Sequence, residues 1–165
     1  MTTTKIGDAT IEYYVEGFGP PLLMIMGFAG MAAAWGEPFL DLLRPRFTTI
    51  RFSNRGSGLS DLPASPLTIR VMADDAAGLL AELGIERAHV FGISMGGMIA
   101  QELALNHAQR VQGLVLGCTN CGGTRTVMAQ PEVIGKMGQL MNLVNQPTAE
   151  MVNEFWRLAV TPEFV

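Results

Sequence analysis

Ser94 is the residue of this sequence whose neighbours best suit covalent chemistry. It stands in the run Gly92-Ile93-Ser94-Met95-Gly96, after a short apolar segment and before a helical apolar pattern. At a sharp strand-to-helix bend a serine hydroxyl is exposed, and nearby backbone N–H groups can stabilise a developing oxyanion. Such a bend needs small neighbours, because a Cβ at Gly92 or Gly96 would collide as the chain folds back. The pattern predicts Ser94 as a nucleophile.

The same chemistry needs two hydrogen-bond donors beside that hydroxyl. Gly27-Phe28 follows a continuous apolar run, so the N–H of Phe28 can face the bend if that run is a neighbouring strand. The N–H of Met95 lies at the start of the expected helix, where the helix dipole favours negative charge. We therefore predict an oxyanion site formed by the backbone N–H groups of Phe28 and Met95. An ordinary strand-ending turn is the alternative for Gly27-Phe28.

These residues must be positioned by strands that alternate with helices. A strand at 10–16 alternates between apolar residues and a polar face with Glu12 and Glu16, as a half-exposed strand should, and pairs with Lys5-Ile6 through a turn at Gly7-Asp8. One helix is expected to begin after Thr68 and to end at Gly84. The remaining expected elements are strands at 22–26, 48–52, 88–91 and 111–116 and helices at 35–43, 69–83 and 95–106. Alternation of this kind predicts an α/β fold: a mainly parallel twisted sheet with an N-terminal antiparallel hairpin and helices on both faces.

Three segments in this order resemble the α/β-hydrolase superfamily over roughly residues 5–121. They are the apolar run ending in Gly27-Phe28, the loop 53–60 (Ser-Asn-Arg-Gly-Ser-Gly-Leu-Ser) and the serine bend. Within that superfamily the chain is most similar to small esterases and lactone hydrolases. The resemblance implies an acyl-enzyme on Ser94, a small-molecule ester or lactone substrate, and no cofactor.

Some positions depart from the family pattern. Met26 stands where histidine is frequent, and Ser53 stands where the loop usually has aspartate. For this loop we favour a structural role, with Arg55 paired to a carboxylate, over direct substrate contact. His89 and His107 are expected too far from Ser94 to act as its base. The family places its acid after a seventh strand and its histidine base after an eighth. Both are therefore expected to be missing from this chain.

The rest of the sequence predicts two parts and leaves a second function open. Residues 1–121 are expected to form an incomplete hydrolase core, and residues 122–165 the start of a helical lid with a helix at 147–159. A non-catalytic fragment or interaction module is the alternative function, with self-association through the exposed edge of the last strand. Perhydrolases or haloperoxidases, C–C hydrolases and peptidases share the serine bend and stay open. Dehalogenases and epoxide hydrolases are disfavoured because they use aspartate where Ser94 stands.

Composition excludes several partner classes. With 11 basic and 15 acidic side chains and no basic stripe, a nucleic-acid partner is not expected. The N-terminus lacks the apolar core of a signal peptide, and breakers interrupt the apolar segment 20–35, so we expect a cytoplasmic protein without a membrane partner. Cys118 and Cys121 form a C-x-x-C that does not open a helix, and no second cysteine pair exists for zinc. Two reduced thiols in a loop, and no metal, are the expectation.

Overall fold

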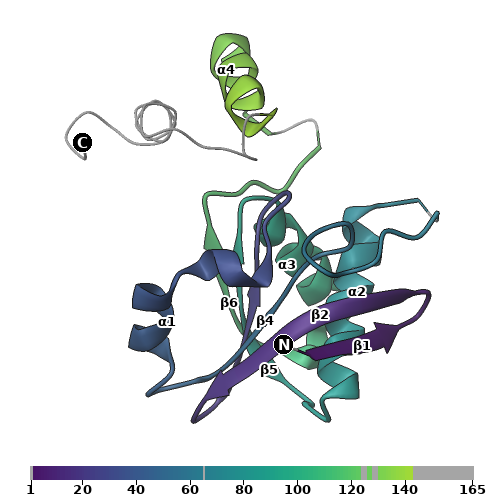
Figure 1. The fold of residues 1–165 in the computed structure, drawn as a ribbon, viewed down its shortest axis with the longest axis vertical. Helices are drawn as coiled ribbons and strands as arrows, with labels where there is room; N and C mark the ends of the chain where they lie inside the picture. Colours follow the sequence, from purple (N-terminus) through teal and green to yellow (C-terminus); the bar gives the residue numbers. More distant parts are fainter. Residues whose placement is uncertain (1, 65, 124–125, 128–129, 143–165) are drawn as a thin grey trace. The chain divides into compact units, whose positions relative to one another are not determined.

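A six-stranded mixed sheet organises the described part of the chain. The structure, a computed structural model, describes residues 2–64, 66–123, 126–127 and 130–142. For residues 137–142 it describes the backbone without side chains. The strands are β1 (Thr2–Ile6), β2 (Ala9–Gly17), β3 (Pro21–Ile25), β4 (Thr48–Phe52), β5 (Ala88–Ile93) and β6 (Val111–Gly117). Their order is β1-β2-β4-β3-β5-β6 (Figure 1). The α/β prediction with its antiparallel N-terminal hairpin is confirmed.

Strand direction divides the sheet into two regions. β1 pairs antiparallel with β2, and β2 pairs antiparallel with β4. The other pairs, β4 with β3, β3 with β5 and β5 with β6, are all parallel. The carboxyl ends of the four parallel strands therefore meet at one edge, which is where ligands bind in open α/β sheets.

Both faces of the central strands are covered. On β3, Leu23 and Ile25 belong to a core shared with the helices α2 (Ile69–Glu82) and α3 (Met95–Asn106). Leu22 and Met24 belong to a second core with Trp35 of η1 (Ala32–Trp35) and Leu40 of α1 (Glu37–Leu43). Figure 1 shows α1 on the side of the strands opposite α2 and α3. Burial on both faces explains why the apolar run in β3 is continuous instead of alternating.

The helix boundaries agree with the sequence signals except at one glycine. The Thr68 side chain accepts a hydrogen bond from the N–H of Val71 (3.1 Å) and caps α2, as expected for an N-cap. The single helix expected at 35–43 is instead a short 3₁₀ turn and α1, separated by Gly36. Gly36 has φ 71° and ψ 136°, a conformation that breaks the helical path and that glycine tolerates.

The chain divides into two compact units, Met1–Gly123 and Thr124–Val165. In the second unit the structure describes α4 (Pro131–Asn142). The helix expected at 147–159 lies outside the described residues, and the boundary expected at residue 121 stays a prediction. Within the described ranges, no helix is long and apolar enough to cross a bilayer.

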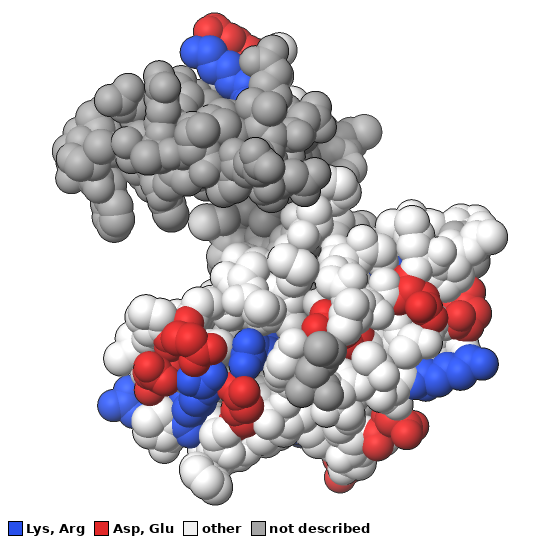
Figure 2. All heavy atoms as spheres, in the orientation of Figure 1, with Lys and Arg blue, Asp and Glu red and all other residues white. Residues whose placement is uncertain are grey.

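Charged side chains are mixed on the visible surface of the first unit. Figure 2 shows acidic and basic groups of that unit alternating in small clusters. Arg44 binds the carboxylates of Glu16, Glu37 and Asp41 at 2.6–2.8 Å.

Candidate functional site

Ser94 occupies a strained bend at the carboxyl edge of the parallel strands. It lies between the last residue of β5, Ile93, and the first residue of α3, Met95, with φ 55° and ψ −125°. Non-glycine residues rarely adopt positive φ, so surrounding contacts must hold this conformation. Ser94 is exposed, as a reactive hydroxyl must be.

Close backbone approach at the bend depends on glycine. A Cβ on Gly92 would overlap the carbonyl oxygen of Gly96 and lie 2.9 Å from the Ala100 Cβ. A Cβ on Gly96 would overlap the carbonyl oxygen of Ile25 and lie 2.6 Å from that of Met26. Separations this short do not occur for real Cβ atoms, so the sequence-based reason for the two glycines is confirmed.

The structure brings the segment with Phe28 next to the serine bend. A Cβ on Gly27 would lie 3.0 Å from the Ser94 Cβ and 3.4 Å from its Oγ. Phe28 and Met95 both line a cavity of about 130 Å³, together with Asn54 and Arg55. The two residues predicted as oxyanion donors thus share one hollow beside Ser94, although Ser94 itself is not part of its wall.

Two residues at the end of β6 hold the backbone of Ser94. The Ser94 N–H donates to the carbonyl oxygen of Gly117 (2.9 Å), and the Thr119 hydroxyl donates to the carbonyl oxygen of Ser94 (2.7 Å). Thr119 was not predicted from the sequence. A hydroxyl two residues after a parallel strand gives no pattern that points to a serine distant in sequence.

Residues with strained backbone conformations cluster at the carboxyl ends of the parallel strands. Among the described residues, the non-glycine positions with positive φ are Ala29 (55°), Ser94 (55°) and Cys118 (49°). Each follows a different parallel strand: β3, β5 and β6. Strained residues of this kind cluster at functional sites, where neighbouring structure compensates their cost.

The loop after β4 anchors the Phe28 segment at both ends. The Asn54 side-chain amide donates to the carbonyl oxygen of Met26 (3.0 Å), and the Ser53 hydroxyl accepts from the N–H of Ala32 (3.0 Å). Asn54 and Ser53 are both buried. Each is a positioning residue in this arrangement, because it acts through the backbone that carries Phe28.

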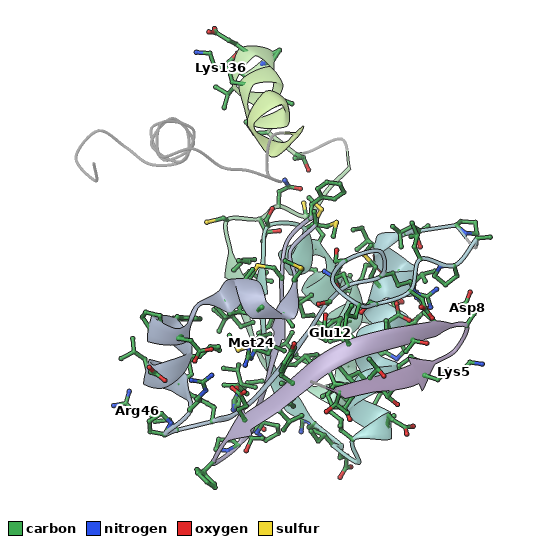
Figure 3. The ribbon with its side chains drawn as sticks, in the orientation of Figure 1. Lys5, Asp8, Glu12, Met24, Arg46 and Lys136 are labelled. Atoms are coloured by element: carbon green, nitrogen blue, oxygen red, sulfur yellow. The ribbon has the colours of Figure 1, made fainter. Side chains whose placement is uncertain are left out.

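Glu12 supplies a carboxylate next to Ser53, the position at which the family's loop usually has aspartate. Its Oε2 accepts from the Ser53 hydroxyl (2.8 Å) and from the N–H of Leu59 (3.1 Å), while Oε1 accepts from the Tyr14 hydroxyl (2.9 Å). Burial raises the pKa of Glu12, but these hydrogen bonds outweigh burial and hold the pKa below its ordinary value of 4.5. The alternation of β2 predicts Glu12 on an exposed face. Instead Glu12, labelled in Figure 3, is only 7% exposed, because Ser53 and Leu59 of the loop after β4 bind its carboxylate.

Arg55 serves the fold through two carboxylates. Its Nε and Nη2 donate to the two oxygens of Asp75 on α2, the second at 2.7 Å, and Nη1 donates to Asp8 in the β1–β2 turn at 2.7 Å. The hydrogen bond to Asp75 is the main cause of a raised Arg55 pKa. The predicted pairing of Arg55 with a carboxylate is confirmed.

Neither histidine of the sequence lies at Ser94. His89 is near the start of β5, five residues and roughly 16 Å before the bend by strand rise. Its ring packs edge-on against Phe47. His107 ends α3 and binds the Asp74 carboxylate through Nε2 at 2.7 Å. In the part of the chain that the structure describes, no three potential metal ligands are grouped together.

Comparison with known proteins places this geometry in a family. Residues 20–142 match the family of the alpha/beta hydrolase fold. A protein named "Putative carbamate hydrolase RutD", from Azorhizobium caulinodans, is 38% identical over 110 residues, which are 67% of this chain and 41% of that protein. A fluoroacetate dehalogenase from a Burkholderia species is 34% identical over 116 residues, covering 67% of this chain and 38% of the dehalogenase.

A solved structure agrees with the architecture. The enol-lactonase from Burkholderia xenovorans LB400 has a TM-score of 0.74 and 26% identity, over 96% of this chain and 65% of the lactonase. The chain spans less than half the length of the curated relatives described above. From the strained serine bend, the strand order and the match over residues 20–142, the chain belongs to the alpha/beta hydrolase family.

Proposed function

We propose that this chain carries the nucleophile and the oxyanion site of a serine hydrolase that acts on carboxylic esters or lactones. The observation that carries the proposal is the exposed Ser94 at φ 55°, which lies between β5 and α3 and next to Gly27. The relatives named as a carbamate hydrolase and an enol-lactonase support hydrolysis of a carbonyl compound.

In the proposed reaction the Ser94 oxygen attacks the substrate carbonyl carbon as its proton passes to a base. The N–H groups of Phe28 and Met95 donate to the oxygen that gains negative charge, and each such donor contributes about 3 kcal/mol of transition-state stabilisation. The bond to the leaving alkoxide then breaks, giving an acyl-enzyme that water hydrolyses. Residues 122–165, with α4 among them, are proposed as the start of a helical lid segment.

The base is the missing group. His89 and His107 are the only histidines of the sequence. His89 packs against the ring of Phe47, and His107 binds the Asp74 carboxylate, so neither contacts Ser94. Without a base, removal of the serine proton and deacylation are both slow, so we expect the 165-residue chain alone to lack steady turnover. An aspartate-nucleophile reaction, such as that of dehalogenases, is disfavoured because serine occupies position 94.

Acylation with an added base tests the proposal directly. The purified chain is incubated with p-nitrophenyl acetate and imidazole, and the tryptic peptide 88–110, in which Ser94 is the one serine, is analysed by mass spectrometry. We expect Ser94 to be acetylated about a hundredfold faster in the folded chain than in the chain unfolded in urea, because only the fold positions the proposed oxyanion donors of Phe28 and Met95 beside it.

The control for this experiment is Ser94→Ala, which must lose the adduct on that peptide. Acetylation of Ser94 at the same rate in the folded and the urea-unfolded chain would contradict the proposal.

A second candidate function is self-association through β6. β6 is an outer strand of the described sheet, and three successive side chains on it are exposed: Leu114 (38%), Val115 (56%) and Leu116 (42%). An uncovered apolar strand edge can pair with another chain. We propose that the 165-residue chain forms dimers or larger species through this edge, whether or not it is catalytic.

A further inference from the structure

Two exposed thiols lie on the segment that holds the backbone of Ser94. Cys118 directly follows β6, and Cys121 lies three residues later. Both are free and exposed, and the sequence has no other cysteine. Any intramolecular disulfide of this chain must therefore join these two residues.

The residues around these thiols contact the serine bend. Gly117, before Cys118, accepts from the Ser94 N–H, and Thr119, after it, donates to the Ser94 carbonyl oxygen. Asn120 accepts at its carbonyl oxygen from the Gln101 side chain on α3 (2.9 Å). The C-x-x-C segment is thus tied to the Ser94 carbonyl oxygen and to the helix that follows Ser94, and the residue directly before it, Gly117, binds the Ser94 N–H.

A second contact makes this arrangement tight. Gly97 lies so close to Thr119 that a Cβ on Gly97 would come within 2.6 Å of the Thr119 side chain. A shift of Thr119 toward α3 would therefore press on the first turn of that helix, and a shift away from it would lengthen the hydrogen bond to Ser94.

Cys118 has an unusual backbone conformation for its residue type. Its φ is 49°, a value that favours glycine over residues with a side chain. The Asn120 side chain accepts from the N–H of Gly122 (2.8 Å), and Gly122 and Gly123 both have positive φ. The chain therefore bends at Cys118 and again directly after Cys121. The two glycines after Cys121 can absorb a shift of that residue.

We propose that Cys118 and Cys121 form a thiol-modification site that small-molecule disulfides of the glutathione type close to a disulfide, and that closure changes the backbone support of Ser94. A bridge requires the two Cα atoms to be about 4.4–6.8 Å apart. Three peptide units span at most about 11 Å, so the bridge is within reach if Thr119 and Asn120 bend. Those two residues carry the contacts to Ser94 and Gln101.

Closure of the disulfide needs no reactant other than one molecule of glutathione disulfide. The thiolate of one cysteine attacks a sulfur of the glutathione disulfide, forms a mixed disulfide and releases one glutathione thiolate. The second cysteine thiolate then attacks the protein sulfur of the mixed disulfide and releases the second glutathione. The two cysteines are oxidised, and one disulfide is reduced to two thiols.

This site differs from a thioredoxin-type dithiol, which opens a helix. The sequence context argues against an oxidoreductase, because the cysteine pair follows the last strand of the described sheet and does not open a helix. Its basis is the placement of both thiols on the segment bound to Ser94, and it holds whether or not Ser94 is a catalytic residue.

Titration with glutathione disulfide tests whether the pair closes. The 165-residue chain is equilibrated in mixtures of reduced and oxidised glutathione, quenched with acid and analysed as the intact protein. We expect the main product to be a monomer that has lost two hydrogens, with the change located on the tryptic peptide 111–125, which contains both cysteines. Cys118→Ser and Cys121→Ser should each stop at the mixed disulfide.

Hydrogen exchange tests whether closure reaches the serine bend. We expect the Ser94 amide of the closed form to exchange up to about tenfold faster than in the reduced form, as for loss of one hydrogen bond. The mixed disulfides of the two serine variants should leave this amide unchanged. A merely exposed thiol pair would close without altering exchange at Ser94.

Three results would overturn the inference: mixed disulfides on both cysteines without closure, disulfide-linked dimers as the main product, or closure with unchanged exchange at the Ser94 amide. None of these outcomes depends on ester hydrolysis, so they are separate from failure of the proposed function.

Discussion

At the scale of single residues, Gly96 carries one of the strictest steric constraints in the structure. Its position against the carbonyl oxygens at the end of β3 leaves no room for a methyl group. We expect Gly96→Ala to lower the free energy of unfolding by about 3 kcal/mol, because backbone atoms must move apart. Urea denaturation followed by circular dichroism measures this change.

The matched control is Gly135→Ala in α4, where an added Cβ meets nothing within 4 Å. We expect this substitution to be neutral or to stabilise by up to about 1 kcal/mol, because alanine favours helix over glycine. Equal effects of the two substitutions would contradict the contact seen at Gly96.

Glu12 gives a pH dependence at the same scale. Its pKa in the folded protein is lowered below 4.5, so the folded state favours the charged carboxylate. This contribution is present above the unfolded-state pKa and is lost as the pH falls through the lower folded-state pKa. We expect Glu12→Gln to cost about 1–3 kcal/mol at pH 7.

The difference between the wild-type chain and Glu12→Gln should shrink as the pH drops below 4.5, because the wild-type carboxylate then becomes protonated as well. Urea unfolding at several pH values measures it, with the exposed Glu86→Gln as a control that changes stability by less than about 0.5 kcal/mol. A constant difference down to strongly acidic pH would contradict the role given to this carboxylate.

At the scale of elements, Arg55 ties the loop after β4 to α2 and to the β1–β2 turn. The Asp75 side chain is 4% exposed, whereas that of Asp8 is 53% exposed. Breaking the buried pair with Asp75→Asn should cost about 3–5 kcal/mol, because the Arg55 charge loses its buried partner. Asp8→Asn should cost less than about 1 kcal/mol, as is usual for an exposed pair.

Thermal and urea unfolding of the two variants compare these costs, and each variant serves as the control for the other. Similar losses would show that burial does not set the strength of these pairs.

At the scale of the whole molecule, the exposed edge of β6 predicts association. We expect Val115→Lys to raise the dissociation constant of any dimer at least about tenfold, because a lysine on a strand edge opposes pairing with another strand. Sedimentation velocity over a range of concentrations measures this. Leu42→Lys on α1, at a position that is 69% exposed, is the control and should leave association unchanged.

A wild-type chain that stays monomeric at every concentration would remove the second candidate function. An equal effect of the two lysine substitutions would mean that association does not use β6.

Local patterns in the sequence predicted most of the elements around the site. The continuous apolar run of β3, the Thr68 cap and the glycines beside Ser94 are short-range signals, because each reflects the backbone or the burial of its own segment. The position of Glu12 could not be predicted in this way. Its strand alternates, and only the loop after β4, about 40 residues away in the chain, covers the face on which Glu12 lies.

The sequence by itself determined the α/β architecture, the serine bend and its small neighbours, since these follow from periodicity and from the steric needs of a single turn. Only the tertiary structure decided which distant residues support that bend: Thr119 and Gly117 at the Ser94 backbone, Asn54 at Met26, and Glu12 in place of an aspartate at Ser53. The physical reason is that these hydrogen bonds join segments far apart in the chain that meet only through the strand order of the sheet, so no local pattern of residues records them.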